Sequence, residues 1–227
     1  MLTLHRAALV LPDPADPTAP SHADGAVLVR DGQVEALGPY AELAAAQPTA
    51  RTRDWADALL TPGLRHPDGH RLLERAYHPD PREELGDAPV PDGLVGETDE
   101  TRCGASARRG LQRMLGFGVT AVAGPFERAS VRTAVARSGL AALPGTVGLP
   151  GAAGLPAALG LPGAPGLPEP VWSLDPLVGL PFAAAVHGRL VVGGRADFAV
   201  FAPGADGARA GGCRATVLGG RLVFRRR

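Results

Sequence analysis

The stretch AVLVRDGQVEALGPYAEL, residues 26–43, carries the clearest fold signal in the chain. Apolar runs flank Asp31-Gly32, a pair that readily supplies the two positive φ angles of a type I′ turn. We therefore predict a β-hairpin here, followed by a short helix over residues 40–46. Upstream, residues 2–11 predict a further strand, and downstream an apolar strand ends at Pro62-Gly63.

The segment between residues 99 and 143 has a helical and then a strand pattern, repeated once. Apolar residues recur at helical spacing over 99–115, VTAVA at 119–123 reads as a buried strand, and 127–137 and 140–143 predict a second helix and strand. This order predicts parallel α/β units.

After residue 187 the chain has the pattern of a small all-β element. LVV, DFAVF, ATVL and RLVF are β-type segments separated by Gly-Gly, Pro-Gly and Asp-Gly turns. The last strand ends in Arg225, Arg226 and Arg227, which form either a solvated tail or an anion contact.

Glycine and proline are abundant, with 31 and 23 of the 227 residues. Much of this excess lies in residues 144–170, where Gly-Leu-Pro recurs at 148, 154, 160 and 166. The spacing is formally that of a collagen-like Gly-X-Y run. We predict instead an extended linker with polyproline II character. The hydrophobic content of 45% favours a packed core for the rest of the chain.

Charge and cysteine content exclude several classes of function. The 23 basic and 23 acidic residues balance, so no overall field favours nucleic acid or an anionic membrane. The chain has no lysine, which excludes Schiff-base and P-loop lysine chemistry. Cys103 and Cys213 form no CxxC pair, and neither a secretion signal nor a membrane-spanning run is present, so we expect a cytoplasmic protein.

Four stretches together carry a family likeness. AVLVRDGQVEALGPYAEL, LLTPGLRHPDGH (59–70) and the closing GRLVVGGRADFAVF and ATVLGGRLVF resemble the amidohydrolase superfamily, nearest to the imidazolonepropionase and aminodeoxyfutalosine deaminase types. The resemblance covers residues 1 to about 143 and 183–227. It implies an α/β fold in which the N- and C-terminal strands form a composite β-sandwich around an inserted metal-dependent barrel. The expected domains are the sandwich (1–61 and 183–227), a truncated (β/α) barrel portion (62–143), the repeat linker (144–170) and a connecting segment (171–182).

The resemblance also implies a chemistry and a candidate site. The family hydrolyses non-peptide carbon-nitrogen bonds with a hydroxide made by divalent cations, zinc or iron. Its HxH ligand pair corresponds to Asp68 and His70, because HPDGH stands where the family has a sequence like NPHTH. His66 alternates with both, so all three could project from one face of a strand and hold a cation, or form a metal-free cluster lining a loop. His78 either joins them or is exposed.

Asp175, in VWSLDPL, is either the equivalent of the family's eighth-strand aspartate, a possible general base, or the N-terminal aspartate of a turn or helix.

Most later ligands of the family have no counterpart. Between His78 and the end the chain has one histidine, His187, and residues 70–143 have room for about three strand-helix units. The barrel therefore cannot close within one chain, and we expect weak or absent catalysis; a non-catalytic scaffold or partner subunit is the alternative. The open edge must be covered by a homodimer or protein partner, or by apolar residues of the return segment, namely Trp172, Leu174, Leu177, Val178, Leu180 and Phe182.

Overall fold

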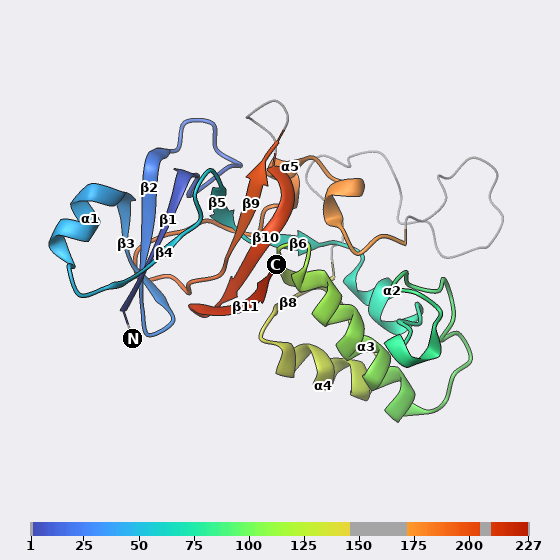
Figure 1. Cartoon of the computed structure of the whole chain (residues 1–227). Helices are drawn as coiled ribbons and strands as arrows, with labels where there is room; N and C mark the ends of the chain where they lie inside the picture. The colour runs from blue at the N-terminus through green and yellow to red at the C-terminus, as the bar shows by residue number, and fades with distance from the viewer. Residues whose placement is uncertain (1, 146–171, 205–209, 227) are drawn as a thin grey trace.

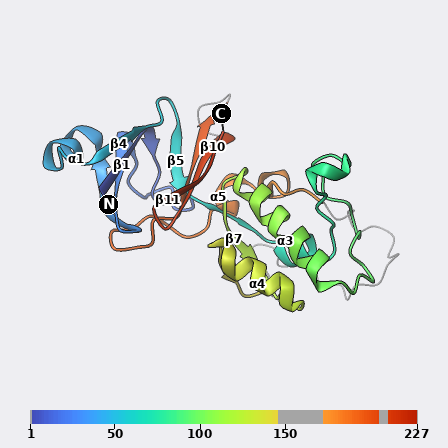
Figure 2. The ribbon, with the colours of Figure 1, turned by 60° about the horizontal axis from the view of Figure 1, so that its bottom comes forward.

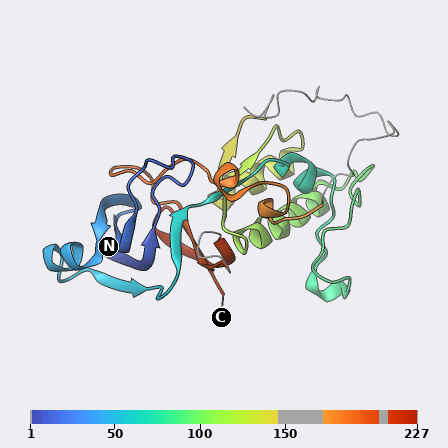
Figure 3. The same cartoon turned by 90° about the horizontal axis from the view of Figure 1, so that it is seen from above.

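The computed structural model describes residues 2–145, 172–204 and 210–226. These residues form an eight-stranded sheet and a separate three-stranded sheet with helices (Figure 1). Figure 3 shows the larger sheet at one end of the molecule and the smaller sheet with its helices at the other. The repeat linker predicted at 144–170 lies almost entirely outside the described residues.

The N-terminal strands form an antiparallel meander. β1 (Leu2–Val10) pairs with β2 (His22–Arg30), which pairs with β3 (Gln33–Pro39). The φ angles of Asp31 and Gly32 are 49° and 88°, so the predicted hairpin turn is confirmed. Helix α1 (Tyr40–Ala46), also as predicted, packs its half-buried apolar side chains over one face of this meander.

Strands from both ends of the chain share the larger sheet. β5 (Leu59–Pro62) pairs antiparallel with β9 (Phe198–Pro203), which continues into β10 (Ala210–Leu218) and β11 (Arg221–Arg225). The strand order is β11-β10-β9-β5-β1-β2-β3, and the composite β-structure predicted from the sequence is confirmed.

The sheet divides beside β1 and encloses a core. β1 pairs in parallel with β4 (Arg51–Asp54) along Thr3–Arg6 and with β5 at Leu9 and Val10. Buried side chains from the N-terminal strands and from β9 and β10 meet in one cluster around Trp55 and Phe198. The two halves of the sheet therefore stabilise each other by burying a common apolar face.

One predicted strand is absent. Residues 190–192 form no strand, because Leu190 is buried while Val191 and Val192 are 41% and 66% exposed. Gly193 has a φ angle of 80°, and its N–H donates to the carbonyl of Val34. The segment is therefore an irregular return connection held by single hydrogen bonds to other strands.

The smaller sheet contains the predicted parallel α/β units. Its strands β6 (Leu64–His66), β7 (Val119–Ala123) and β8 (Ala141–Leu143) are parallel and adjacent in that order. Three helices connect them: α2 (Gly69–Glu74), α3 (Glu100–Leu115) and α4 (Ala129–Ser138). Their apolar faces pack on β7, and Figure 2 shows α3 and α4 side by side. The described strands do not close into a barrel, since β6 and β8 are both edges.

The caps of these helices match their sequence. Asp99 accepts a hydrogen bond from the N–H of Thr101 at the start of α3, and Gly139, with a φ angle of 81°, ends α4. Helix α4 has no capping side chain of its own. Instead, Glu100 of α3 accepts the N–H of Ser130 in the first turn of α4, and Glu74, at the end of α2, accepts from the N–H groups of Glu127 and Arg128 just before it.

The return segment after the repeat covers the edge of β6, which is one of the alternatives that the sequence left open. The N–H of His187 donates to the carbonyl of Gly63 over 2.8 Å, and Val186 forms a β-bridge with Leu64. Two short 3-10 helices, at Pro81–Glu83 and Pro176–Val178, and helix α5 (Phe182–Ala185) complete the described elements. Of the apolar residues expected to pack here, Leu174, Leu177, Leu180, Phe182 and Trp172 contact buried clusters.

Val178 is an exception, because it is 63% exposed at the outer side of its 3-10 turn.

The two sheets meet through close packing at Gly63 and Phe201. A Cβ atom on Gly63 would lie 2.1 Å from Cγ2 of Thr120, so only glycine fits between β5 and β6. Phe201 of β9 is buried and contacts Phe182 edge to face, with ring centroids 5.7 Å apart. This contact joins the composite sheet to the return segment.

Two further observations bear on where the chain resides. Cys103 and Cys213 are both unpaired and buried. Among the described residues, no helix is long and apolar enough to cross a bilayer. The cytoplasmic location expected from the sequence stays a prediction.

Candidate functional site

The HPDGH segment spans the end of β6 and the start of α2. The strand ends at His66, Asp68 occupies the N-cap position, and the helix begins at Gly69. Of the two alternatives for His66, Asp68 and His70, the structure therefore does not show a single strand with all three on one face. Pro67 has no N–H to continue the strand, and Gly69 lies so close to β7 that an added Cβ would be 2.9 Å from the carbonyl oxygen of Ala123.

Both ring nitrogens of His66 already have partners. The N–H of Asp68 donates to Nδ1 over 3.2 Å, so Nε2 carries the hydrogen, which it donates to the carbonyl of Ser173 over 2.9 Å. The side chain is 3% exposed. Burial lowers the pKa of His66, opposed by the hydrogen bond to Ser173. The ring is therefore neutral at pH 7 and has no free lone pair for a cation.

Of the other two predicted ligands, Asp68 pairs with an arginine side chain and His70 is exposed to solvent. The carboxylate of Asp68, 44% exposed, pairs with Arg71 over 3.4 Å. His70 is exposed on the first turn of α2. Arg71 in turn stacks on Trp172, with the guanidinium carbon 4.9 Å from the ring centroid. Throughout the described residues, no three His, Cys, Asp or Glu side chains gather into a group that could hold a metal ion.

The remaining strand ends bring no ligands to this edge. In barrel enzymes the reacting groups lie at the carboxyl ends of the parallel strands. Here β7 ends in Val122 and Ala123, and β8 ends in Ala142 and Leu143. Among β6, β7 and β8, only the first ends in an imidazole. The residues present at these ends do not fit the zinc or iron that the family resemblance implies, and the metal site at His66, Asp68 and His70 stays a prediction.

Asp175 occupies the N-cap of the 3-10 helix Pro176–Val178. Its Oδ1 accepts the N–H of Leu177 over 2.9 Å, and its own N–H donates to Oγ of Ser173 over 3.1 Å. The structure thus places Asp175 as the turn aspartate that the sequence offered as one alternative. Its carboxylate is near enough to raise the pKa of His66 slightly against the effect of burial. Its role as a general base remains untested.

His78 is neither exposed nor part of the HPDGH cluster. It is fully buried beneath α3, where Nε2 bonds the carbonyl of Leu72 over 2.8 Å and the backbone N–H donates to Oγ of Ser106 over 2.8 Å. Burial lowers the pKa of His78 to about 4. An added Cβ on Gly110 would lie 2.6 Å from its ring, so the helix is built to accommodate this imidazole.

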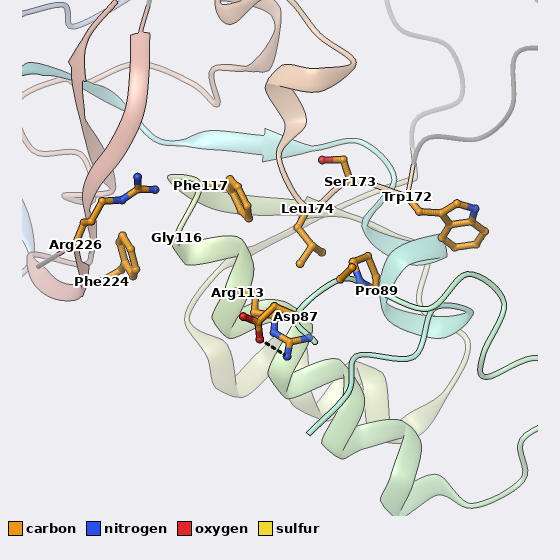
Figure 4. A pocket seen from close by; sticks show the side chains of 11 residues that line it. Asp87, Pro89, Arg113, Gly116, Phe117, Trp172, Ser173, Leu174, Phe224 and Arg226 are labelled. Atoms are coloured by element: carbon orange, nitrogen blue, oxygen red, sulfur yellow. Dashed lines mark hydrogen bonds and ion pairs between the residues drawn. The ribbon is translucent and has the colours of Figure 1, made fainter. Parts of the chain in front are cut away.

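A pocket of about 720 Å³ lies between α3, residues 172–174 and the end of β11. We call it the α3 pocket, and it is bounded by loop 87–89, the carboxyl end of α3 with Phe117, residues 172–174, and the end of β11 with Phe224 and Arg226. Figure 4 shows the side chains of Phe117, Leu174 and Trp172 arranged along it. Its volume is that of a small-molecule site.

The α3 pocket was not predicted from the sequence. Its walls come from four segments far apart in the chain, and no spacing rule links them. Two local signals were available. Trp172 is one of only two tryptophans and follows the repeat directly, and the C-terminal arginines were considered as an anion contact.

Fold and site together define a composite-sheet protein that carries an open, three-stranded α/β layer. The model of the imidazolonepropionase-like composite domain of bacteria matches residues 25–50, which form the end of the β2–β3 hairpin and α1. Over these residues the resemblance inferred from the sequence is confirmed. No curated protein matches the chain.

Several solved deaminases are similar to part of the chain. Guanine deaminase from Bradyrhizobium japonicum is 21% identical, with a TM-score of 0.45, over 63% of this chain and 34% of the enzyme. Helicobacter pylori aminofutalosine deaminase is 16% identical, with a TM-score of 0.44, over 63% and 33%. A zinc-bound adenosine deaminase from Xanthomonas campestris is 22% identical, with a TM-score of 0.43, over 62% and 33%. The similarity spans about a third of each of these enzymes.

Proposed function

We propose that this chain is a relative of the imidazolonepropionase-type amidohydrolases that does not itself hydrolyse carbon-nitrogen bonds, and that it acts as a binding module or partner subunit built on the composite sheet. Hydrolysis in that family requires a hydroxide generated by a divalent cation. The observation that carries the proposal is that, among the described residues, no third ligand gathers with Asp68 and His70, because the nitrogens of His66 are used by Asp68 and Ser173.

The surroundings of His66 support the same conclusion. Ser173 belongs to the return segment, and Leu174 beside it is buried in the core of the α/β layer. Freeing Nε2 would therefore mean detaching a packed segment, which costs about 1 to 3 kcal/mol for the unpaired carbonyl alone. Alanine, valine and leucine side chains at the ends of β7 and β8 offer no compensating ligand.

The alternative is a hydrolase in which Asp68 and His70 hold zinc or iron and Asp175 is the general base. Asp68 and His70 are accessible at the surface, which is the one observation in favour of this alternative. Its substrates would be ring or amide C–N compounds of the kind acted on by guanine and adenosine deaminases.

Elemental analysis distinguishes the two. The purified protein is loaded with Zn²⁺, Fe²⁺ or Mn²⁺, desalted, and assayed for bound metal and for ammonia release from guanine and adenosine. We expect far less than one metal per chain, no ammonia, and the same values for His70→Ala. His22→Ala, a histidine on β2, is the matched control. One metal per chain that is lost in His70→Ala but kept in His22→Ala, together with ammonia release, would overturn the proposal.

A further inference from the structure

The α3 pocket combines apolar walls with two arginines. Phe117 follows α3, Trp172 and Leu174 belong to the return segment, and Phe224 lies on β11. These side chains also border the buried clusters of the α/β layer, so their positions are fixed by packing. Aromatic faces held in this way favour a flat, apolar ligand.

Arg113 supplies a positive charge inside the pocket. Its Nη2 donates to the carbonyl of Pro79 over 3.0 Å and to Asp87 over 3.1 Å, while its Nη1 is buried without a hydrogen-bond partner. The Asp87 carboxylate is 91% exposed, so it compensates this charge only weakly. Figure 4 shows the pair at the wall of the pocket.

Arg226 supplies a second positive charge at the rim. It is exposed at the end of β11 and lines the pocket together with Phe224. Within the described part of the chain, no carboxylate pairs with it. Arg226 therefore offers its guanidinium at the end of the pocket beside Phe224, whereas Arg113 is paired with Asp87 along the wall (Figure 4). An anionic group on an apolar ligand complements this arrangement, because a guanidinium binds carboxylate or sulfonate oxygens with two parallel donors.

We infer that the α3 pocket binds a small aromatic acid, with its ring against Phe117 and Phe224 and its anionic group toward Arg226. The pocket extends from the carboxyl end of α3, next to the amino end of β7, to Ser173, whose carbonyl accepts the hydrogen bond from His66. Binding here requires neither a metal nor hydrolysis, so it stands or falls separately from the proposed function.

Two fluorescent probes of similar shape test the charge. The first is 1-anilinonaphthalene-8-sulfonate, an aromatic anion, and the second is N-phenyl-1-naphthylamine, its uncharged analogue. Titrations of the whole protein are expected to give one anion per chain, bound more tightly than the neutral probe. Arg226→Ala should weaken the anion about threefold to fivefold and leave the neutral probe unchanged.

The neighbouring residue provides a matched control. Arg225 lies on the same strand but over Trp55, 5.7 Å from its ring centroid, and does not line the α3 pocket. Arg225→Ala should therefore leave both probes unchanged. Equal affinity of the two probes, or equal effects of the two substitutions, would overturn the inference.

A blocking substitution tests the location. Ala88 lines the pocket from an exposed loop, so Ala88→Trp should fill it without disturbing the core, and Leu85→Trp on the same loop is the control because Leu85 is 63% exposed outside the pocket. We expect Ala88→Trp to abolish binding of both probes. Unchanged binding to Ala88→Trp would refute the assignment. Loss of probe binding at protein concentrations where sedimentation velocity shows dimers would instead assign the pocket to a second copy and also refute it.

Discussion

Lowering the pH from about 8 to about 5 is expected to weaken the fold, and two of its buried histidines, His5 and His78, account for about 4 kcal/mol because they resist protonation in the folded state. His5 lies inside the composite sheet, where Nδ1 accepts the indole N–H of Trp55 and the ring meets Phe198 edge to face. His78 lies beneath α3. Each has one ring nitrogen that is buried and without a hydrogen-bond partner.

The magnitude follows from the two pKa values. Burial, helped by the charge of Arg53, lowers the pKa of His5 from 6.5 to about 3, and burial lowers that of His78 from 6.5 to about 4, with Arg113 and Arg109 acting in the same direction. The unfolded chain therefore binds more protons than the folded chain below pH 6.5. The free energy of unfolding consequently decreases as the pH is lowered below 6.5. At pH 5 each histidine contributes about 2 kcal/mol to the loss, at about 1.4 kcal/mol per pKa unit.

Urea denaturation followed by tryptophan fluorescence at several pH values between 5 and 8 measures this loss. His5→Phe keeps an aromatic ring beside Trp55. This variant and His78→Gln should each reduce the difference in the free energy of unfolding between pH 8 and pH 5 by about 2 kcal/mol. His70→Gln, at an exposed site, should leave it unchanged. A free energy of unfolding that is constant over this range, or a pH dependence that both buried variants retain, would refute the reasoning.

Three further substitutions test individual contacts. Gly63→Ala is expected to cost about 2 kcal/mol or more in thermal unfolding, since the new Cβ would overlap a threonine of β7, whereas Gly38→Ala, which has open space around it, should change little. His66→Ala removes the hydrogen bond to Ser173 and should speed amide hydrogen exchange over the following 3-10 turn, and unchanged exchange would contradict this. Glu74→Ala removes two hydrogen bonds to the backbone just before α4 and should cost about 1 kcal/mol in urea unfolding; an unchanged free energy of unfolding would contradict this role.

The parts of the fold that the sequence predicted depend on local signals. Asp31-Gly32 requires a tight turn whatever surrounds it, and the spacing of Ala107, Leu111 and Met114 requires a helix with one apolar face. The resemblance then placed strands from both ends in one sheet. The prediction of a strand at 190–192 was wrong. Its three apolar residues do not alternate between buried and exposed positions in the fold.

The candidate site was harder to predict because its contacts are distant in sequence. His66 and Ser173 are 107 residues apart, and only the folded chain shows that the carbonyl of Ser173 accepts a hydrogen bond from Nε2 of His66. His78 was expected to join the cluster or be exposed, yet α3 covers it. A histidine in a sequence is a possible metal ligand. Its hydrogen-bond partners in the folded chain decide whether one of its ring nitrogens has a lone pair free for a metal ion.

The pairing of β5 with β9 has a consequence for biosynthesis. Leu59 lies opposite Phe201, so the N-terminal meander cannot complete its sheet until β9, more than a hundred residues further along, has left the ribosome. Until then the inward faces of Val27 and Val29 have no partner strands from β9 and β10 to bury them. Such non-local pairing slows folding and lengthens the time for which apolar strand surface is accessible to other chains. We therefore expect the nascent protein to depend on chaperone protection during translation more than its length alone would suggest.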